Sequence, residues 1–352
     1  MGIGHKMRIL RIVLMADTHL GFDYPVKPRV ERRRRGPDFF ANFRQVLTYA
    51  RQTHPDLVLH GGDLFFRARV PQKIVDLVYA DLFDFAGEGI PFIIVPGNHE
   101  RSILPASLFL NHPNIYVFDK QKTYEFYFND VKVSLSGFPC ERKAARDKFS
   151  SLLKSSGWYE QDADIKLLCM HQTVEGAQVG PANYTFRSGK DVIQRQDLPG
   201  DAAAVLCGHI HRQQVLGDPA NSKMEYPLVI YPGSIERTSF AEKDERKGFY
   251  EIEFAETKGS WGIRRLKFIE LPSRPMEDLQ LDGKVTPESL GDFILSRITV
   301  MAPGSIVRLR CDPKTDPEVI SMVTSKFLRE ILPESMNYQF SVEFRQRLLD
   351  GN

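Results

Sequence analysis

The sequence has few cysteines, no long apolar run and almost no net charge, and each of these absences excludes a class of protein. The four cysteines lie far apart and form no CxxC pair, a usage typical of a reducing compartment rather than a disulfide framework. No apolar run approaches the length of a membrane span, and the N-terminus lacks the apolar core of a signal peptide. We therefore expect a soluble, cytoplasmic protein without membrane contact.

The formal net charge of the 352-residue chain is only +2, which excludes a global basic field for nucleic acid. Any such binding needs a local patch, for which the arginine run Arg32–Arg35 is the candidate. This run is either a phosphate-contacting loop or a solvated loop, the usual fate of charge runs. No Walker A motif is present, since Gly189-Lys190 is followed by Asp191, so any ATP dependence would come from a partner.

Apolar strand-like runs alternate with helical periodicity over most of the chain, a pattern typical of layered α/β proteins. Short alternating strands follow between residues 115 and 137, and strands at 228–231 and 248–254 predict that a second sheet finishes the domain. Two prolines and polar residues at 271–278 indicate a boundary between a large domain, residues 1–272, and a small α+β module, residues 273–352. In the module we expect helices at 288–297 and 317–332 and strands at 305–311 and 338–344.

Five of the strand-like runs end in side chains that can bind metal ions. The central run, 57–60, is followed by two glycines and then by Asp63. Five of the nine histidines fall at these ends, and chance does not explain such a distribution; we interpret His60 as a core or supporting residue. The residues at the five ends are Asp17 and His19, Asp63, Asn98 and His99, His171, and His209 and His211.

These ligand types suit divalent cations. Carboxylate, imidazole and amide donors without a thiolate favour Mn²⁺, Fe²⁺ or Zn²⁺ over an iron–sulfur cluster or a structural zinc site. The set is too large for one ion, and a two-metal site needs one carboxylate to bridge ions ~3.5–4 Å apart. Asp63 is the only acid alone at a strand end and is the predicted bridge. Two cations at this spacing favour hydrolysis of a phosphoester.

The motifs DxH, GD, GNH[DE], a lone His and GHxH, in this order, resemble the calcineurin-like metallophosphoesterase superfamily over residues 8–240. The segments 17–21, 61–65 and 231–240 resemble one branch, the SbcD-type DNA double-strand-break nucleases, which include the meiotic recombination nucleases. The resemblance implies a two-sheet α/β/β/α sandwich. It also implies that the small C-terminal α+β module stands where the branch carries its DNA-capping domain.

The resemblance further implies a role for each residue of the ligand set. The first metal ion takes Asp17, His19, Asp63 and His211, and the second takes Asp63, Asn98, His171 and His209. His99 is not a ligand in this pattern but faces the scissile phosphate, where it stabilises the transition state or protonates the leaving oxygen. The alternative is that His99 only supports Asn98.

Phe66 departs from the pattern of the branch. In archaeal and eukaryotic members a histidine at this position helps to hold the substrate phosphate, and an apolar ring cannot donate a hydrogen bond to it. Bacterial members vary here. Exonuclease action is therefore a weaker expectation than phosphodiester hydrolysis itself.

The resemblance implies Mn²⁺ as the metal and DNA ends, hairpins or single strands as the substrate. The implied partners are a second copy of the chain and an SbcC-type ABC ATPase, bound through helices beyond the cap. The chain ends at Asn352, so we expect that attachment to be short or absent.

Two other functions stay open. A phosphodiesterase or phosphatase for a small molecule, such as a cyclic nucleotide, would agree with Phe66 and with the low net charge. A non-catalytic, metal-stabilised scaffold is disfavoured because all seven ligands and His99 are present.

Overall fold

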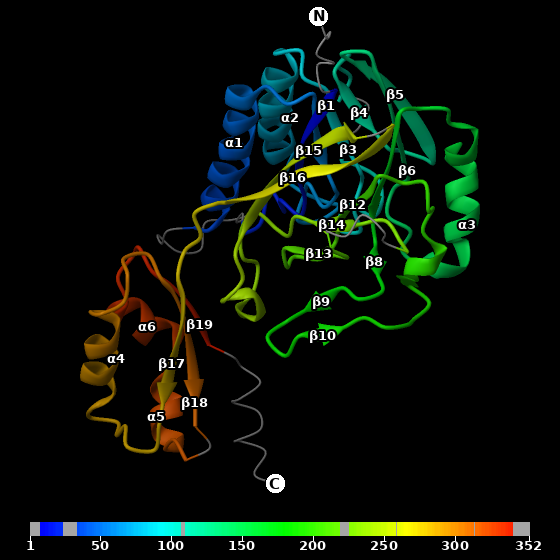
Figure 1. Cartoon of the computed structure of the whole chain (residues 1–352). Helices are drawn as coiled ribbons and strands as arrows, with labels where there is room; N and C mark the ends of the chain where they lie inside the picture. Colours follow the sequence, from blue (N-terminus) through cyan, green and yellow to red (C-terminus); the bar gives the residue numbers. More distant parts are fainter. Residues whose placement is uncertain are drawn as a thin grey trace, which may run out of the picture. The chain divides into compact units, whose positions relative to one another are not determined.

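Two six-stranded sheets form the body of the protein, seen in a computed structural model that describes residues 8–23, 34–106, 110–218, 225–257, 259–312 and 314–340. In the first sheet four adjacent strands run parallel, and two long antiparallel strands extend one edge (Figure 1). One of these two contains the strand predicted at 248–254, so its assignment to the second sheet is wrong. Its strands, in spatial order, are β16 (Ser260–Glu270), β15 (Gly248–Thr257), β1 (Ile9–Met15), β2 (Leu57–His60), β3 (Phe92–Ile94) and β4 (Ile115–Val117).

The second sheet is also mixed, with parallel strands at its centre and an antiparallel strand at each edge. Its strands, in spatial order, are β13 (Gln214–Leu216), β14 (Val229–Tyr231), β12 (Ala204–Gly208), β7 (Ile165–His171), β6 (Val131–Gly137) and β5 (Lys122–Phe128). Shorter elements lie in the connections. The 3-10 helix η2 (Trp158–Glu160) precedes β7, and η4 (Phe240–Glu242) follows β14. Between β7 and β12 lie β8 (Thr173–Val174), β9 (Gln178–Val179), β10 (Tyr184–Thr185), β11 (Val192–Ile193) and η3 (Arg195–Asp197).

The main core lies between the two sheets. Leu10, Ile12 and Leu14 alternate along β1 and belong to one buried cluster with Leu135 of β6 and Leu167 of β7. Burial of each such side chain contributes about 1.5–3 kcal/mol of transfer free energy. This alternation is what a half-buried strand requires, and it holds the two sheets face to face.

Helices cover the outer faces of both sheets and complete four layers. Figure 1 places α1 (Gly36–Thr53) and α2 (Gln72–Ala86) beside the first sheet, and α3 (Ala145–Ser155) beside the second. Val13 and Met15 point away from the inter-sheet core and are nevertheless buried, because helices shield that face. The predicted α/β/β/α sandwich is confirmed. No helix within the described ranges is long and apolar enough to cross a bilayer.

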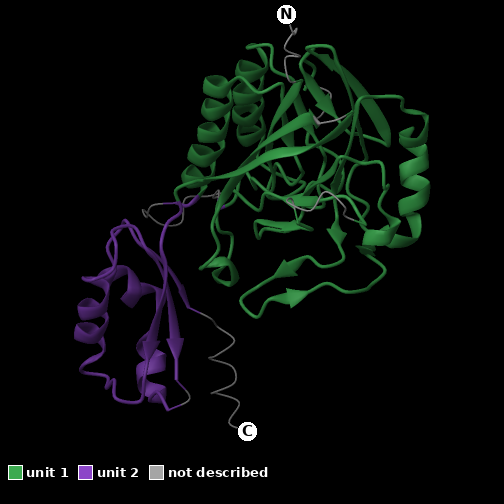
Figure 2. Cartoon of the chain, in the orientation of Figure 1, with its two compact units in different colours: residues 1–22, 36–272 green, residues 23–35, 273–352 purple. Residues whose placement is uncertain are grey.

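Residues 273–352, together with 23–35, form a second compact unit (Figure 2). Its three-stranded sheet is wholly parallel, with β18 in the middle and helices in the connections. The elements are β17 (Met276–Leu281), α4 (Leu290–Ile298), β18 (Ile306–Cys311), α5 (Pro317–Met322), α6 (Ser325–Ile331) and β19 (Asn337–Phe340).

Two details of this unit differ from expectation. The predicted helix 317–332 is wrong as a single element, because Val323 leaves the helical region and Thr324 caps a new helix by accepting from Phe327 N at 3.2 Å. The strand β17 begins at Met276, inside the stretch interpreted as a boundary. Beyond Phe340 the predicted last strand lies outside the described residues.

Candidate metal centre

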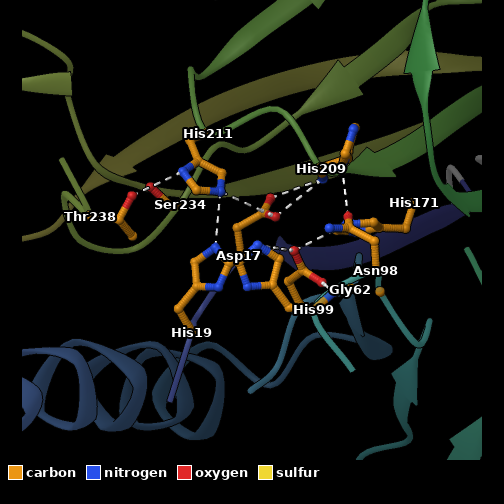
Figure 3. A network of polar contacts seen from close by, with 12 residues as sticks. Asp17, His19, Gly62, Asn98, His99, His171, His209, His211, Ser234 and Thr238 are labelled. Carbon is orange, nitrogen blue, oxygen red and sulfur yellow. Dashed lines mark hydrogen bonds and ion pairs between the residues drawn. The ribbon is translucent and has the colours of Figure 1, made fainter. Parts of the chain in front are cut away.

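The five predicted strand ends meet at one place, where the carboxyl ends of β1, β2 and β3 adjoin those of β7 and β12. Backbone hydrogen bonds join the loops, with Asp17 N donating to Gly62 O at 2.8 Å and His19 N donating to Asp63 O at 3.0 Å. The two sheets connect here through a bridge between Ala16 and Ser234. Figure 3 shows the polar side chains from both sheets turned toward one another. All eight residues of the predicted set converge at this point: Asp17, His19, Asp63, Asn98, His99, His171, His209 and His211.

Left-handed backbone conformations turn four of these side chains into the centre. Asp17, His19, Asp63 and His209 have φ angles of 50°, 44°, 54° and 89°. Such conformations cost of order 1–3 kcal/mol each in non-glycine residues and persist where the surrounding structure fixes them. Their concentration at the strand ends marks this edge as a functional site rather than a set of ordinary turns.

Two glycines permit the close approach of the ligands. A Cβ atom on Gly62, whose φ is 115°, would lie 2.1 Å from His171 Nδ1. A Cβ atom on Gly97 would lie 2.0 Å from Asp63 Oδ1 and 2.4 Å from Asp63 N. The contact of a Gly97 Cβ atom with Asp63 N involves backbone on both sides, so the Asp63 loop would have to shift to relieve it.

Gly97→Ala should therefore displace the Asp63 loop, lower the melting temperature and weaken Mn²⁺ binding at least about tenfold. The matched control is Gly200→Ala, since a Cβ atom on Gly200 has no heavy atom within 4 Å among the described residues. Calorimetric Mn²⁺ titration of both variants measures the effect. Equal affinities for the two variants would contradict this role for Gly97.

Asp17, His19 and His211 form the first group of donors. His19 Nε2 and His211 Nε2 face each other at 2.9 Å, and His211 Nε2 lies 3.9 Å from Asp17 Oδ1. Two nitrogens that bind one ion at ~2.0–2.1 Å and at right angles lie about 3 Å apart, so this spacing fits a shared cation. Burial lowers the pKa of His19 well below its usual value and keeps its imidazole neutral, as a metal ligand must be.

Asn98, His171 and His209 form the second group. Asn98 Oδ1 lies 3.0 Å from His171 Nε2 and 2.8 Å from His209 Nδ1. His171 Nδ1 faces the carbonyl oxygen of Gly61 at 2.8 Å, which can only accept and so requires the proton on Nδ1. Burial opposes a second proton on this ring, but the adjacent Asp63 outweighs it and raises the pKa of His171 to about 9. Without a metal ion Nε2 is therefore protonated and donates to Asn98 Oδ1, and a cation bound there would displace this proton.

Asp63 lies between the two groups. Its carboxylate is 3.4 Å from His171 Nε2. Within the described ranges Asp63 belongs to two groups of side chains that could hold a metal ion. One group also contains His19 and His99, and the other also contains Asp17 and His171. Burial opposes ionisation of Asp63, but the adjacent His171 outweighs it and holds the Asp63 pKa well below its usual range. Asp63 is therefore an anion in the position that a bridging ligand would occupy.

His99 lies at the open side of the centre. Its Nδ1 is 2.6 Å from the carbonyl oxygen of Phe66, which fixes the proton on Nδ1. Its Nε2 is 3.8 Å from Asp63 Oδ2, and the side chain is 35% exposed, in contrast to the buried His171. His99 thus has Nε2 on the side of the ring that faces Asp63.

The phenyl ring of Phe66 lies against the histidines. Its centroid is 5.8 Å from that of His99 and 6.0 Å from that of His19, and Phe22 packs edge-on against it at 4.9 Å. The side chain of Phe66 offers no hydrogen-bond donor, but its backbone carbonyl orients His99.

Half of the arginine run is paired with an acid. Arg34 Nη1 lies 3.1 Å from Asp23 Oδ1, and Arg35 N donates to Asp23 Oδ2 at 2.8 Å. Arg32 and Arg33 lie outside the described residues, so a phosphate contact by the run stays a prediction.

Sequence reasoning missed the support given by Glu100. Its buried carboxylate accepts from Phe65 N at 2.6 Å and from Gly97 N at 2.8 Å, which joins the loops after β2 and β3. Burial, with Asp63 nearby, raises the pKa of Glu100 to about 8. Glu100 is the acidic residue of the GNH[DE] motif, which could have directed attention to it but not to Phe65 as its partner.

His60 supports the centre from below and is not a ligand. Its Nε2 donates to Thr18 Oγ1 at 2.9 Å, because that hydroxyl gives its own proton to Leu64 O at 3.0 Å. Gly62 N donates to His60 Nδ1 at 3.2 Å. These bonds join the loops after β1 and β2 and confirm the interpretation of His60 as a supporting residue.

His60 also predicts a loss of stability in acid. Burial lowers its pKa from the usual 6.5 to about 3. Between these pH values His60 is therefore protonated in the unfolded chain but neutral in the folded protein. This contribution to the free energy of unfolding is complete above about pH 6.5 and is lost toward pH 3, at up to about 1.4 kcal/mol per pH unit.

Urea unfolding at pH 7.5 and pH 5 tests this expectation. The difference in stability between wild type and His60→Gln should shrink by up to about 2 kcal/mol between these pH values. His54→Gln, at an exposed histidine, should follow the wild-type profile. Parallel profiles for wild type and His60→Gln would contradict the role of burial.

Comparison with known families and proteins agrees with this geometry. The family model described as calcineurin-like phosphoesterase matches residues 10–213. The DNA double-strand break repair protein Mre11 of Methanopyrus kandleri is 23% identical over 80% of this chain and 61% of its own length. Mre11 of Methanocaldococcus jannaschii is 26% identical over 78% of this chain and 70% of its own. This chain thus spans less than two thirds of the Methanopyrus protein.

Among solved structures, a dimetal phosphatase from Danio rerio is similar, with a TM-score of 0.42 and 14% identity. The match covers 74% of this chain and 98% of that one.

Proposed function

This chain belongs to the calcineurin-like phosphoesterase family, and we propose that it is a two-metal-dependent DNA nuclease acting in DNA double-strand-break repair. The family and the candidate metal groups support a metal-dependent hydrolase. One observation carries the proposal further: donors from five strand ends of two sheets converge beside His99 in a chain similar to Mre11 proteins.

We propose that the seven donors hold two cations, most readily Mn²⁺, with Fe²⁺ and Zn²⁺ as alternatives. The first position takes Asp17, His19, Asp63 and His211, and the second takes Asp63, Asn98, His171 and His209. When bound, such a pair neutralises the phosphate charge and lowers the pKa of an attacking water toward neutrality. The donors fit this role because they are preorganised by buried hydrogen bonds before any ion binds.

His99 is the residue that would act on the substrate directly. With Nδ1 tied to the Phe66 carbonyl, Nε2 is the atom that meets the phosphodiester. In the protonated state this nitrogen donates to the oxyanion in the transition state or passes its proton to the leaving oxygen. Attack in line with the leaving group requires the phosphate to stand between His99 and the two metal positions.

We further propose that residues 273–352 serve as a cap that takes part in DNA binding, and that residues 1–272 carry the nuclease centre. The proposed partners are an SbcC-type ABC ATPase, from which any ATP dependence would come, and a second copy of the chain. DNA ends, hairpins or single strands are the proposed substrates.

The direct test is Mn²⁺-dependent digestion of end-labelled duplex, hairpin and circular single-stranded DNA side by side. We expect cleavage of at least one substrate, with circular DNA reporting endonuclease action and labelled ends reporting exonuclease action. Cleavage of none of them would contradict the proposal.

A small-molecule diesterase is the second candidate, because the apolar ring of Phe66 stands beside His99 where a phosphate-binding side chain would be expected. Competition separates the two candidates. Duplex DNA at low salt should inhibit hydrolysis of a chromogenic diester by a nuclease, and lack of inhibition would favour the small molecule.

A further inference from the structure

Glu242 lies directly behind His211, on the side of the imidazole away from the other metal donors. Its Oε1 is 3.1 Å from His211 Nδ1 and accepts from Thr238 Oγ1 at 2.5 Å. Figure 3 shows Thr238 on this same side of the His211 ring. The residue belongs to η4 and is buried, with 7% of its surface exposed. Nothing in the motif pattern assigns a role to it.

The carboxylate determines which nitrogen of His211 carries the proton. A carboxylate can only accept, so the hydrogen bond at 3.1 Å places the proton on Nδ1. In the neutral ring Nε2 then carries the lone pair, and it is this atom that faces His19 Nε2 at 2.9 Å. The other tautomer would point an N–H at the first metal position and prevent ligation there.

A buried lysine holds Glu242 in place. Lys247 is 1% exposed, and its Nζ lies 2.7 Å from Glu242 Oε2 and 3.0 Å from Glu245 Oε2. The same ammonium donates to the backbone oxygen of His211 at 3.0 Å. A buried ammonium group requires such partners, because removal of the carboxylates would leave its charge unpaired in the protein interior. His211 is thereby held twice, through its ring by Glu242 and through its backbone by Lys247.

Glu245 provides an internal comparison. It shares Lys247 with Glu242 and is 3.2 Å from Arg212 Nε. Among the described residues its carboxylate bonds to these two cations and not to His211. The two glutamates therefore differ chiefly in whether they reach the imidazole.

We propose that Glu242, supported by Lys247, is a positioning residue that fixes the tautomer and ring orientation of His211 and so sets the affinity of the first metal position. This inference rests on the proposed assignment of His211 as a ligand. Carboxylates that accept from the second nitrogen of a ligating histidine typically change metal affinity 10–100-fold when removed.

The test compares Glu242→Gln with Glu245→Gln by calorimetric Mn²⁺ titration without DNA. We expect one of the two metal positions to weaken at least about tenfold in Glu242→Gln and to stay within about twofold of wild type in Glu245→Gln. Equal losses in both variants, or no loss in Glu242→Gln, would overturn the proposal. Metal-free melting temperatures show whether each variant is folded.

A second measurement needs no variant. In wild-type protein labelled with ¹⁵N-histidine and freed of metal, the His211 ring should show its proton on Nδ1. A proton on Nε2 alone would overturn the proposal. Neither measurement depends on DNA cleavage, so the role of Glu242 can be tested even if the protein cuts no DNA. If the protein does cut DNA and Glu242→Gln binds Mn²⁺ like wild type, only the role of Glu242 is refuted.

Discussion

Replacement of Asp63 by asparagine should reduce Mn²⁺-dependent DNA cleavage by at least about a thousandfold. Asp63 is 1% exposed and lies 3.4 Å from His171 Nε2, between the two groups of donors. A neutral amide has nearly the same shape but cannot supply negative charge to two cations at once. Cleavage rates of labelled DNA under single-turnover conditions measure the change.

Asp81→Asn is the matched control, because Asp81 pairs with Arg44 at 2.9 Å on the helical surface. This variant should cleave like wild type, since exposed ion pairs contribute little. Robust cleavage by Asp63→Asn in metal-replete buffer would remove Asp63 from the centre of the mechanism.

Replacement of His99 by alanine should lower the rate of cleavage about 10²–10⁴-fold while leaving the metal content unchanged. The ring nitrogen that faces the centre is not needed to hold Asn98, whose amide oxygen lies near His171 and His209 instead. The backbone of His99, which donates to Asp63 Oδ1 at 2.9 Å, is kept in the alanine variant.

Metal analysis of the purified His99→Ala protein separates the two interpretations of this residue. A direct role in chemistry predicts wild-type metal content with slow cleavage. If metal content falls in step with activity, His99 only supports Asn98. His112→Ala, at a histidine beside Phe83 and remote in sequence from the motifs, provides the control for loss of an imidazole.

The convergence of the proposed ligands could be predicted from the sequence because of a simple geometric rule. Parallel strands that enter one edge of a sheet bring their carboxyl ends together, so polar residues after Met15, His60 and Val95 must meet. The same rule applies to β7 and β12 in the second sheet. The local sequence pattern was therefore sufficient to predict where each of these strands ends.

The supporting residues could not be predicted in this way. Glu100 bonds to Phe65, 35 residues away, and Glu242 reaches His211 across 31 residues. Neither pairing leaves a periodic signal, because each depends on how loops fold over one another. The left-handed conformations of Asp17 and Asp63 also depend on tertiary contacts, because residue type makes this region only more accessible to aspartate than to most residues.

The small unit shows the limits of periodicity for short elements. The helix predicted at 317–332 contains a continuous apolar pattern, but the side-chain cap at Thr324 starts a second helix within it. The strand β17 follows two prolines closely and was hidden by them. The parallel pairing of β17 with β18 has no local signature, since strand direction is fixed by the connection between them.

Electron paramagnetic resonance of the Mn²⁺-loaded protein tests the two-metal centre most directly. We predict two Mn²⁺ ions per chain with the signal of an exchange-coupled pair, because Asp63 as the proposed bridge would hold them ~3.5–4 Å apart. In Asp63→Asn the coupled signal should be lost. One ion per chain in wild type, or two ions with the signal of isolated Mn²⁺, would contradict the account.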